Sequence, residues 1–236
     1  LTAKDLKAHI TPKTKALILP YPCNPTGAIM EKKDLEEIAK VLENTNIAVI
    51  SDEIYSELTF GTNHVSFASV GNMKERTVTV NGFSKTFSMT GWRLGYACGP
   101  EEIIKQMTKI HQFAIMCAPT VSQYAAVDAL RNGDAAINAM KEEYNRRRKL
   151  TVASFNEIGL ACREPKGAFY AFPSIEKSGL SCNEFCERLL KEKHVAIVPG
   201  IAFGKGGEGF VRASYCYSTE HLIKAVERID EFLKTL

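Results

Sequence analysis

The chain has 236 residues, which is enough for one large domain or two ordinary ones. Its hydrophobic fraction of 45% is typical of a globular protein with a sizeable core, and the net charge of +3 is too small to indicate a nucleic-acid partner. No apolar run approaches the length of a membrane span, and no signal-peptide pattern opens the chain.

The seven cysteines are odd in number and widely scattered, and several lie inside apolar runs. This usage is typical of reduced thiols in the cytoplasm and does not indicate a disulfide framework. We therefore expect mostly buried, free cysteines. Cys182 and Cys186 are spaced i and i+4 and could share a metal, but no second Cys/His pair accompanies them, so we expect no metal site.

The first half of the chain alternates short apolar strands with helices. The pattern predicts helices over 1–10, with Thr2 as the N-cap, and over 30–42, and strands over 14–19, 47–50, 76–80 and 94–98. Such alternation indicates an α/β fold with a mostly parallel sheet.

The second half begins with helices over 100–116 and 121–160, the latter interrupted near 132–134, and continues with shorter elements. Strands are predicted over 168–172, 195–198 and 210–214, and helices over 183–191 and 219–236. We predict part of a larger domain over 1–118, connecting helices over 119–158 and a small α/β domain over 159–236. The basic run 146–149 is interpreted as a solvated helix face.

Three polar segments each directly follow a predicted strand. They are the Pro-rich loop 20–27, the segment 52–55, and a stretch from 81 that contains Lys85. Because ligands of α/β sheets bind beyond the carboxyl ends of the strands, these segments predict one site at one sheet edge.

Lys85 lies among hydroxyl residues, and Arg93 follows eight positions later. A lysine in this setting suits the binding of a phosphate, or the presentation of an amine nucleophile that a neighbouring cation keeps neutral. On this stretch alone, a solvated lysine in a Gly/Ser-rich loop is an equally good interpretation.

Four motifs in order resemble the class I/II aminotransferases, pyridoxal-phosphate enzymes of fold type I that include aspartate and aromatic aminotransferases. They are Asn-Pro-Thr-Gly at 24–27, Asp-x-x-Tyr at 52–55, Ser-Lys at 84–85 with Gly-Trp-Arg-Leu-Gly at 91–95, and Arg212 in Val-Arg-Ala-Ser. The resemblance extends over essentially the whole chain. It implies the C-terminal part of a large cofactor-binding domain over 1–118 and a smaller C-terminal domain.

The resemblance implies three catalytic residues. Lys85 would form an imine with the aldehyde of pyridoxal 5'-phosphate and then carry a proton to or from the substrate α-carbon. Asp52 would pair with the pyridinium nitrogen and keep it protonated. Tyr55 would donate a hydrogen bond to the phenolic oxygen of the cofactor.

The resemblance also implies the binding residues. Asn24 would contact the phenolic oxygen and help to hold the substrate carboxylate, and Arg212 would bind that carboxylate with its planar fork. Arg93 and Ser84 would hold the phosphate. Other members place a hydroxyl three residues before the lysine, where this chain has Gly82.

The implied function is ping-pong transfer of an amino group between an L-amino acid and a 2-oxo acid, by a cytoplasmic homodimer without nucleic-acid or membrane partners. Two alternatives stay open. One is a pyridoxal-phosphate carbon–sulfur lyase, which would use Lys85 and Asp52 for the same first step. The other is an aminotransferase-like domain of a transcription regulator with a winged-helix domain in front of it.

The front of the chain departs from the family pattern. Members carry on the order of 150 further residues before the Asn-Pro-Thr-Gly strand, comparable to a whole domain. They supply a glycine-rich phosphate loop, a stacking aromatic residue and a tyrosine from the dimer partner. We therefore expect this chain to be a C-terminal fragment that by itself binds the cofactor poorly, turns over little and leaves apolar surface bare.

Overall fold

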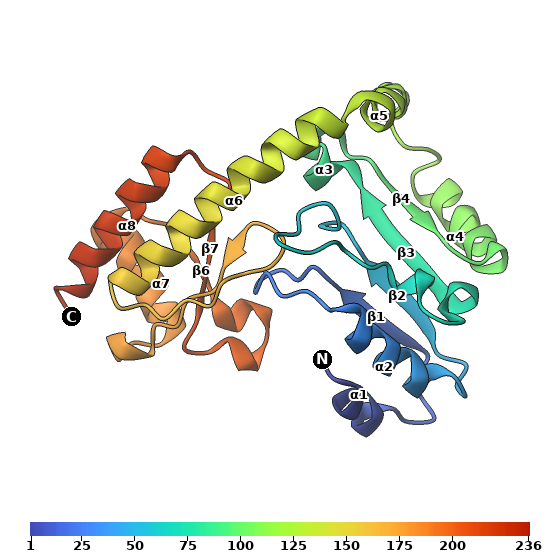
Figure 1. Cartoon of the computed structure of the whole chain (residues 1–236), viewed down its shortest axis with the longest axis horizontal. Coiled ribbons are helices and arrows are strands. Elements are labelled where there is room, and N and C mark those ends of the chain that lie inside the picture. Colours follow the sequence, from blue (N-terminus) through green and yellow to red (C-terminus); the bar gives the residue numbers. More distant parts are fainter. The chain divides into compact units, whose positions relative to one another are not determined.

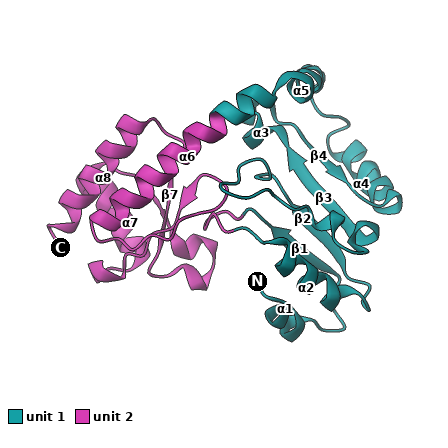
Figure 2. Ribbon diagram, viewed as in Figure 1, with its two compact units in different colours: residues 1–22, 29–139 teal, residues 23–28, 140–236 magenta.

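The computed structural model describes residues 1–236, and the chain folds as two compact units. Unit 1 comprises residues 1–22 and 29–139, and unit 2 comprises residues 23–28 and 140–236 (Figure 2). The short loop 23–28 therefore belongs with the C-terminal half of the chain. The three-part domain division predicted from the sequence stays a prediction. None of the helices is both long and apolar enough to cross a membrane.

Unit 1 contains a four-stranded sheet in the order β1-β2-β3-β4 (Figure 1). Its strands are β1 Ala16–Pro20, β2 Ala48–Asp52, β3 Thr77–Gly82 and β4 Gly95–Cys98. The first three strands run parallel, and β4 runs antiparallel to β3. The α/β class and the mostly parallel sheet predicted from the sequence are confirmed.

The helices of unit 1 form where the sequence pattern predicted them. They are α1 Ala3–His9, α2 Lys32–Leu42, α4 Glu101–Ala114 and α5 Thr120–Asn132. The one-turn helix α3 Phe83–Thr86 was not predicted. Thr2 caps α1, because its hydroxyl accepts a hydrogen bond from the backbone N–H of Asp5 at 3.1 Å. The buried face of α2 consists of the residues whose spacing predicted it, namely Leu35, Ile38, Ala39 and Leu42.

One face of the sheet in unit 1 is covered and the other is open. Leu19 and Val49 are buried in a core with α1, α2 and the segment that contains Phe67. Ile18 and Ile50, which alternate with them along the strands, are exposed. The apolar surface that we expected to be bare is present.

Further apolar side chains are exposed on α4 and α5. Helix α4 buries none of its residues, and the side chain of Phe113 on it is 97% exposed. Tyr124 and Leu130 on α5 are also exposed. These helices carry an apolar surface that no other part of the chain covers.

Unit 2 contains a three-stranded antiparallel sheet with short strands and longer helices. Its elements are α6 Asp134–Glu157, whose first turns belong to unit 1, β5 Tyr170–Ala171, α7 Cys182–Lys193, β6 Val198–Pro199, β7 Val211–Ser214 and α8 Thr219–Leu233. The strand order is β5-β7-β6. Helices α7 and α8 contact each other through the rings of Phe185 and Phe232, whose centroids are 5.3 Å apart.

Two predicted strands of unit 2 are shorter than expected. Only Tyr170–Ala171 of residues 168–172 and only Val198 of residues 195–198 are in strands. The remaining apolar residues of the two predicted strands, Ala168, Phe169 and Val195, are buried but do not pair with a neighbouring strand. Burial alone produces the same apolar pattern as a buried strand.

The prediction of a solvated basic face on α6 is wrong for Arg148, which is 6% exposed. Its guanidinium donates hydrogen bonds to the side-chain oxygen of Asn145, to Glu164 at 2.6 Å and to the carbonyl of Pro165 at 2.9 Å. Arg146 fits the prediction, since it is exposed and pairs with Glu143. Arg148 therefore anchors the segment that leads into β5.

The prediction of mostly buried cysteines is also wrong in part. All seven thiols are free, but only Cys162, Cys182 and Cys186 are buried. Cys98, Cys117 and Cys216 are exposed. The apolar neighbours of Cys98 misled the prediction, because they lie in β4 at the uncovered edge of the sheet.

Candidate active site

Lys85 and Asp52 lie just beyond or at the carboxyl ends of two neighbouring parallel strands. Asp52 is the last residue of β2, and its Cα pairs with Val80 of β3. Helix α3, which carries Lys85, begins directly after β3. The Nζ atom of Lys85 lies 5.9 Å from the centroid of the buried Tyr55 ring. Unit 1 thus brings together the three residues predicted to be catalytic.

One oxygen of the Asp52 carboxylate is available to a ligand. Its Oδ1 atom accepts a hydrogen bond from the backbone N–H of Ile54 at 3.2 Å, and this contact orients the side chain. The other oxygen makes no hydrogen bond within the chain. Asp52 shares the open face of the sheet with Ile50, because residues two apart on a strand point to the same side.

Ser84 and Arg93 belong to one hydrogen-bonded loop. Thr90 connects them, since its hydroxyl donates to the carbonyl of Ser84 at 3.0 Å and its own carbonyl accepts from Arg93 at 2.8 Å. Arg93 is exposed and has a left-handed backbone, with φ of 52°. Its remaining N–H groups and the Ser84 hydroxyl are donors of the kind that phosphate binds.

Gly82 allows the close approach of backbones at the start of this loop. A Cβ atom at Gly82 would lie 3.1 Å from both the Cα of Gly95 and the carbonyl oxygen of Leu94. A side chain at this position would therefore require the neighbouring backbone to shift by a few tenths of an ångström. Ser84 and Arg93 stay the predicted phosphate donors of this chain.

Asn24 and Arg212 contact each other within unit 2. The Nη1 atom of Arg212 donates a hydrogen bond to Oδ1 of Asn24 at 2.7 Å. The guanidinium lies 4.5 Å from the ring centroid of Tyr170 and 4.9 Å from that of Phe203. Its Nε atom is buried and has no hydrogen-bond partner. A carboxylate bound side-on to the guanidinium would satisfy this buried donor.

The loop that carries Asn24 is fixed to the rest of unit 2 by Gly27. The Gly27 carbonyl accepts hydrogen bonds from the backbone N–H groups of Lys166 and Gly167, both at 2.9 Å. The peptide bond between Asn24 and Pro25 is cis. The loop is therefore held by the segment that Arg148 anchors at Pro165.

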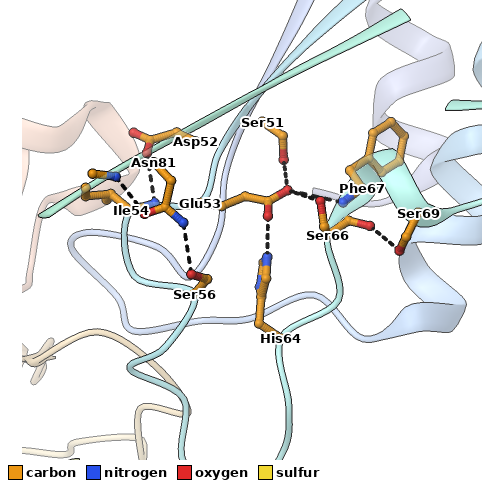
Figure 3. A network of polar contacts seen from close by, with 11 residues as sticks. Ser51, Asp52, Glu53, Ile54, Ser56, His64, Ser66, Phe67, Ser69 and Asn81 are labelled. Carbon is orange, nitrogen blue, oxygen red and sulfur yellow. Dashed lines mark hydrogen bonds and ion pairs between the residues drawn. The ribbon is translucent and has the colours of Figure 1, made fainter. Parts of the chain in front are cut away.

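Glu53 is a buried polar residue that the sequence reasoning missed. Its carboxylate is the centre of a hydrogen-bond network with Ser51, His64, Ser66 and the backbone of Phe67 (Figure 3). A signal was present, because an acidic residue directly after a buried strand requires partners, and a His-x-Ser pattern at 64–66 could supply them. Tyr170 and Phe203, which flank Arg212, were also missed as parts of the site.

The predicted site residues therefore form two groups, each within one unit. Unit 1 holds the carboxylate of Asp52, the phenol of Tyr55 and the amine of Lys85. It also holds Ser84 and Arg93, whose hydrogen-bond donors are predicted to bind a phosphate. Unit 2 holds the pair Asn24 and Arg212, which is predicted to bind a carboxylate. This donor set fits pyridoxal 5'-phosphate, since an aldehyde needs an amine, a pyridine nitrogen needs a carboxylate, and a phosphate needs cationic and hydroxyl donors.

An α/β sheet with a lysine beyond its strand ends, together with a separate carboxylate-binding arginine, is typical of enzymes that act on amino acids through a bound aldehyde cofactor. Comparisons with known proteins identify the family. The model of the family "Aminotransferase class I and II" matches residues 1–229. The chain belongs to this family.

Curated relatives and solved structures agree with that assignment. The chain is 50% identical to the aspartate aminotransferase of Pyrococcus abyssi over 99% of its length, and 47% identical to aromatic-amino-acid aminotransferase 2 of Thermococcus litoralis. It superposes on the crystal structure of an aromatic aminotransferase from Pyrococcus horikoshii with a TM-score of 0.96 and 50% sequence identity. The superposition covers 100% of this chain and 64% of the aromatic aminotransferase. The chain spans 61% of each of the two curated relatives. The fold type I architecture expected from the motifs is confirmed.

Proposed function

We propose that the protein transfers an amino group between an L-amino acid and a 2-oxo acid, with pyridoxal 5'-phosphate as cofactor. The observation that carries this proposal is the partly satisfied guanidinium of Arg212. Its Nε donor is buried without a partner, while Asn24 and two aromatic rings fix the plane of the group. This arrangement suits the carboxylate that amino acids and 2-oxo acids share.

The bound cofactor would supply an aldehyde that accepts the amino group and a ring that withdraws electrons from the substrate. Lys85 would hold the cofactor covalently and, once released, would move a proton at the substrate α-carbon through its Nζ atom. The free oxygen of Asp52 would accept a hydrogen bond from the ring nitrogen and keep it protonated. The Tyr55 hydroxyl would donate to the phenolic oxygen.

The remaining residues would bind the cofactor phosphate and the substrate carboxylate. Ser84 and Arg93 would bind the phosphate from one loop of unit 1. Asn24 and Arg212 would bind the substrate carboxylate from unit 2. We propose that the complete enzyme is a cytoplasmic homodimer, in keeping with the free cysteines and with the apolar surface on α4 and α5.

The relatives named above are aspartate and aromatic-amino-acid aminotransferases, which favours amino transfer over the lyase and regulator alternatives. The two enzyme reactions differ in their products. A transferase needs a 2-oxo acid acceptor, whereas a carbon–sulfur lyase releases ammonia and pyruvate without one.

The proposal is tested by replacing Lys85 in the full-length protein. We expect wild-type protein to retain the cofactor covalently after borohydride reduction, detected by intact mass, and the Lys85→Ala variant to lose both this retention and amino transfer. The exposed Lys74→Ala is the matched control and should behave as wild type. Covalent retention in Lys85→Ala, or release of ammonia without an acceptor by wild type, would contradict the proposal.

A further inference from the structure

Glu53 lies in the turn between Asp52 and Tyr55, and its side chain points away from that of Asp52 (Figure 3). Ser51 faces the covered side of the sheet, and Asp52 faces the open side, because successive strand residues alternate. Glu53 is 3% exposed, and its carboxylate lies beside Ser51, as Figure 3 shows. A buried carboxylate is costly unless its oxygens are hydrogen-bonded, so its partners require explanation.

The protein satisfies both oxygens of this carboxylate. Oε1 accepts hydrogen bonds from the hydroxyls of Ser51 at 2.9 Å and Ser66 at 2.8 Å, and from the backbone N–H of Phe67 at 3.2 Å. Oε2 lies 2.9 Å from Nε2 of His64. Burial acts to raise the pKa of Glu53, but the hydrogen bonds from His64 and Ser66 outweigh it and lower the pKa. Glu53 is therefore ionised at neutral pH.

The backbone of Glu53 fixes the same turn. Its N–H donates to the carbonyl of Val80 on β3 at 2.9 Å, and its carbonyl accepts from the N–H of Ser56 at 2.9 Å. The Ser56 hydroxyl in turn accepts a hydrogen bond from Asn81 at 3.1 Å, just before α3 begins. The turn is therefore held on one side by the end of β3 and on the other by segment 64–67.

We propose that Glu53 is a positioning residue, which holds Asp52 and Tyr55 in register with Lys85 by anchoring their turn to segment 64–67. Glu53 does not contact Lys85, and its carboxylate is occupied by Ser51 and segment 64–67, so it acts through Asp52 and Tyr55. This inference rests on the proposed function, because it assigns Glu53 a part in placing groups of that site. Apart from the Ser51 hydroxyl, the contacts on its two oxygens come from residues 11 to 14 positions further along the chain.

Two substitutions distinguish the effect of the hydrogen bonds of Glu53 on the turn from the effect of its negative charge. Glu53→Ala removes every side-chain contact. Glu53→Gln keeps an oxygen for the three donors and turns an amide toward the His64 ring, whose other tautomer accepts. The control is Glu57→Gln, which removes the same charge from an exposed position in the same segment.

The first readout is hydrogen exchange of residues 54–58 in the cofactor-free, full-length protein. We expect exchange to rise by about tenfold or more in Glu53→Ala, since each 1.4 kcal/mol of lost local stability changes an opening equilibrium tenfold. Glu53→Gln and Glu57→Gln should keep wild-type exchange there. Unchanged exchange in Glu53→Ala, or an equal rise in Glu53→Gln, would overturn the inference.

The second readout is steady-state amino transfer by the same variants with cofactor bound. Displacement of catalytic groups by about 1 Å costs up to about a hundredfold, so we expect kcat of Glu53→Ala to fall by roughly 10- to 100-fold. KM for the amino acid should change little, because Arg212 is untouched, and Glu53→Gln should restore most of kcat. Wild-type kcat in Glu53→Ala would overturn the inference.

A third variant covers the case in which Glu53→Ala does not fold. His64→Ala removes only the partner of Oε2 and should raise exchange at 54–58 and lower kcat, both by less than Glu53→Ala. Wild-type values of both would overturn the inference. If wild-type protein shows no amino transfer, the proposed function fails, while hydrogen exchange still decides whether Glu53 anchors the turn.

Discussion

The guanidinium of Arg212 donates a 2.7 Å hydrogen bond to the side-chain oxygen of Asn24, a residue 188 positions earlier in the chain. This contact lies within unit 2, because loop 23–28 belongs to that unit. It occupies one end of the guanidinium and leaves the buried Nε available. The pair is thus arranged to present a two-donor edge to a carboxylate.

We predict that Arg212→Lys raises KM for the amino-acid donor in the full-length protein. A lysine keeps the charge but loses the planar fork, and a hydrogen bond to a charged group contributes about 1.5–3 kcal/mol, so KM should rise about tenfold or more. Steady-state kinetics measures the change. Arg163→Lys, an exposed position of the same unit, serves as control, and equal KM values for the two variants would contradict the prediction.

Gly27→Ala should destabilise unit 2. Gly27 has φ of +65°, and an added Cβ would lie 2.3 Å from the Cβ of Pro165 and 2.8 Å from the carbonyl oxygen of Gly167. A strained backbone conformation costs about 1–3 kcal/mol, and the steric overlap adds to this cost. Urea unfolding measures the loss of stability.

The control for Gly27 is Gly206→Ala in the same unit. A Cβ atom there meets nothing within 4 Å, and the backbone is not left-handed. Its effect on the free energy of unfolding should stay within about 0.5 kcal/mol. Similar unfolding midpoints for the two variants would show that loop 23–28 is not packed as described.

Arg146 and Arg148 of α6, two positions apart, should differ sharply in their effect on stability. Arg148→Met leaves the buried carbonyl of Pro165 and the Asn145 oxygen without their donor, so we expect a loss of about 2–3 kcal/mol. Arg146→Met removes only an exposed ion pair with Glu143 and should cost less than about 1 kcal/mol. Chemical denaturation compares them, and equal losses would be the contrary result.

The thiols should react in two groups that follow burial. Burial raises the pKa of Cys162 to about 11 and that of Cys186 to about 12. At pH 8 the thiolate fraction of Cys162 is then about one in a thousand, and thiolate is the reactive form. Maleimide labelling followed by peptide mass spectrometry should modify the exposed Cys98 and Cys216 first. Labelling of native Cys162 as fast as Cys216 would contradict the assignment of burial.

Local patterns were sufficient to predict much of the fold. The spacing of Leu35, Ile38 and Leu42 predicted the buried face of α2, and Thr2 predicted a helix start. Lys85 and Asp52 were located because each follows an apolar strand, and strand ends are where α/β sheets place ligands. These features depend on residues close together in the sequence.

The features that the sequence did not predict depend on distant partners. Arg148 resembled its solvated neighbours, and only Glu164 and Pro165, 16 and 17 residues later, explain its burial. Glu53 likewise depends on His64 and Ser66. The strand predicted over 195–198 forms only at Val198 for the same reason, since an apolar run predicts burial and only a partner strand makes it part of a sheet.

The sheet of unit 1 ends on β1 at one edge and on β4 at the other, and neither outer strand has a further partner in this chain. Each therefore presents backbone amides and carbonyls that can template an incoming strand. The exposed Ile18 and Tyr96 beside these edges would bury apolar area as such a strand docks. Self-association of the chain should consequently proceed by strand addition and grow with concentration, since each added copy presents a further free edge.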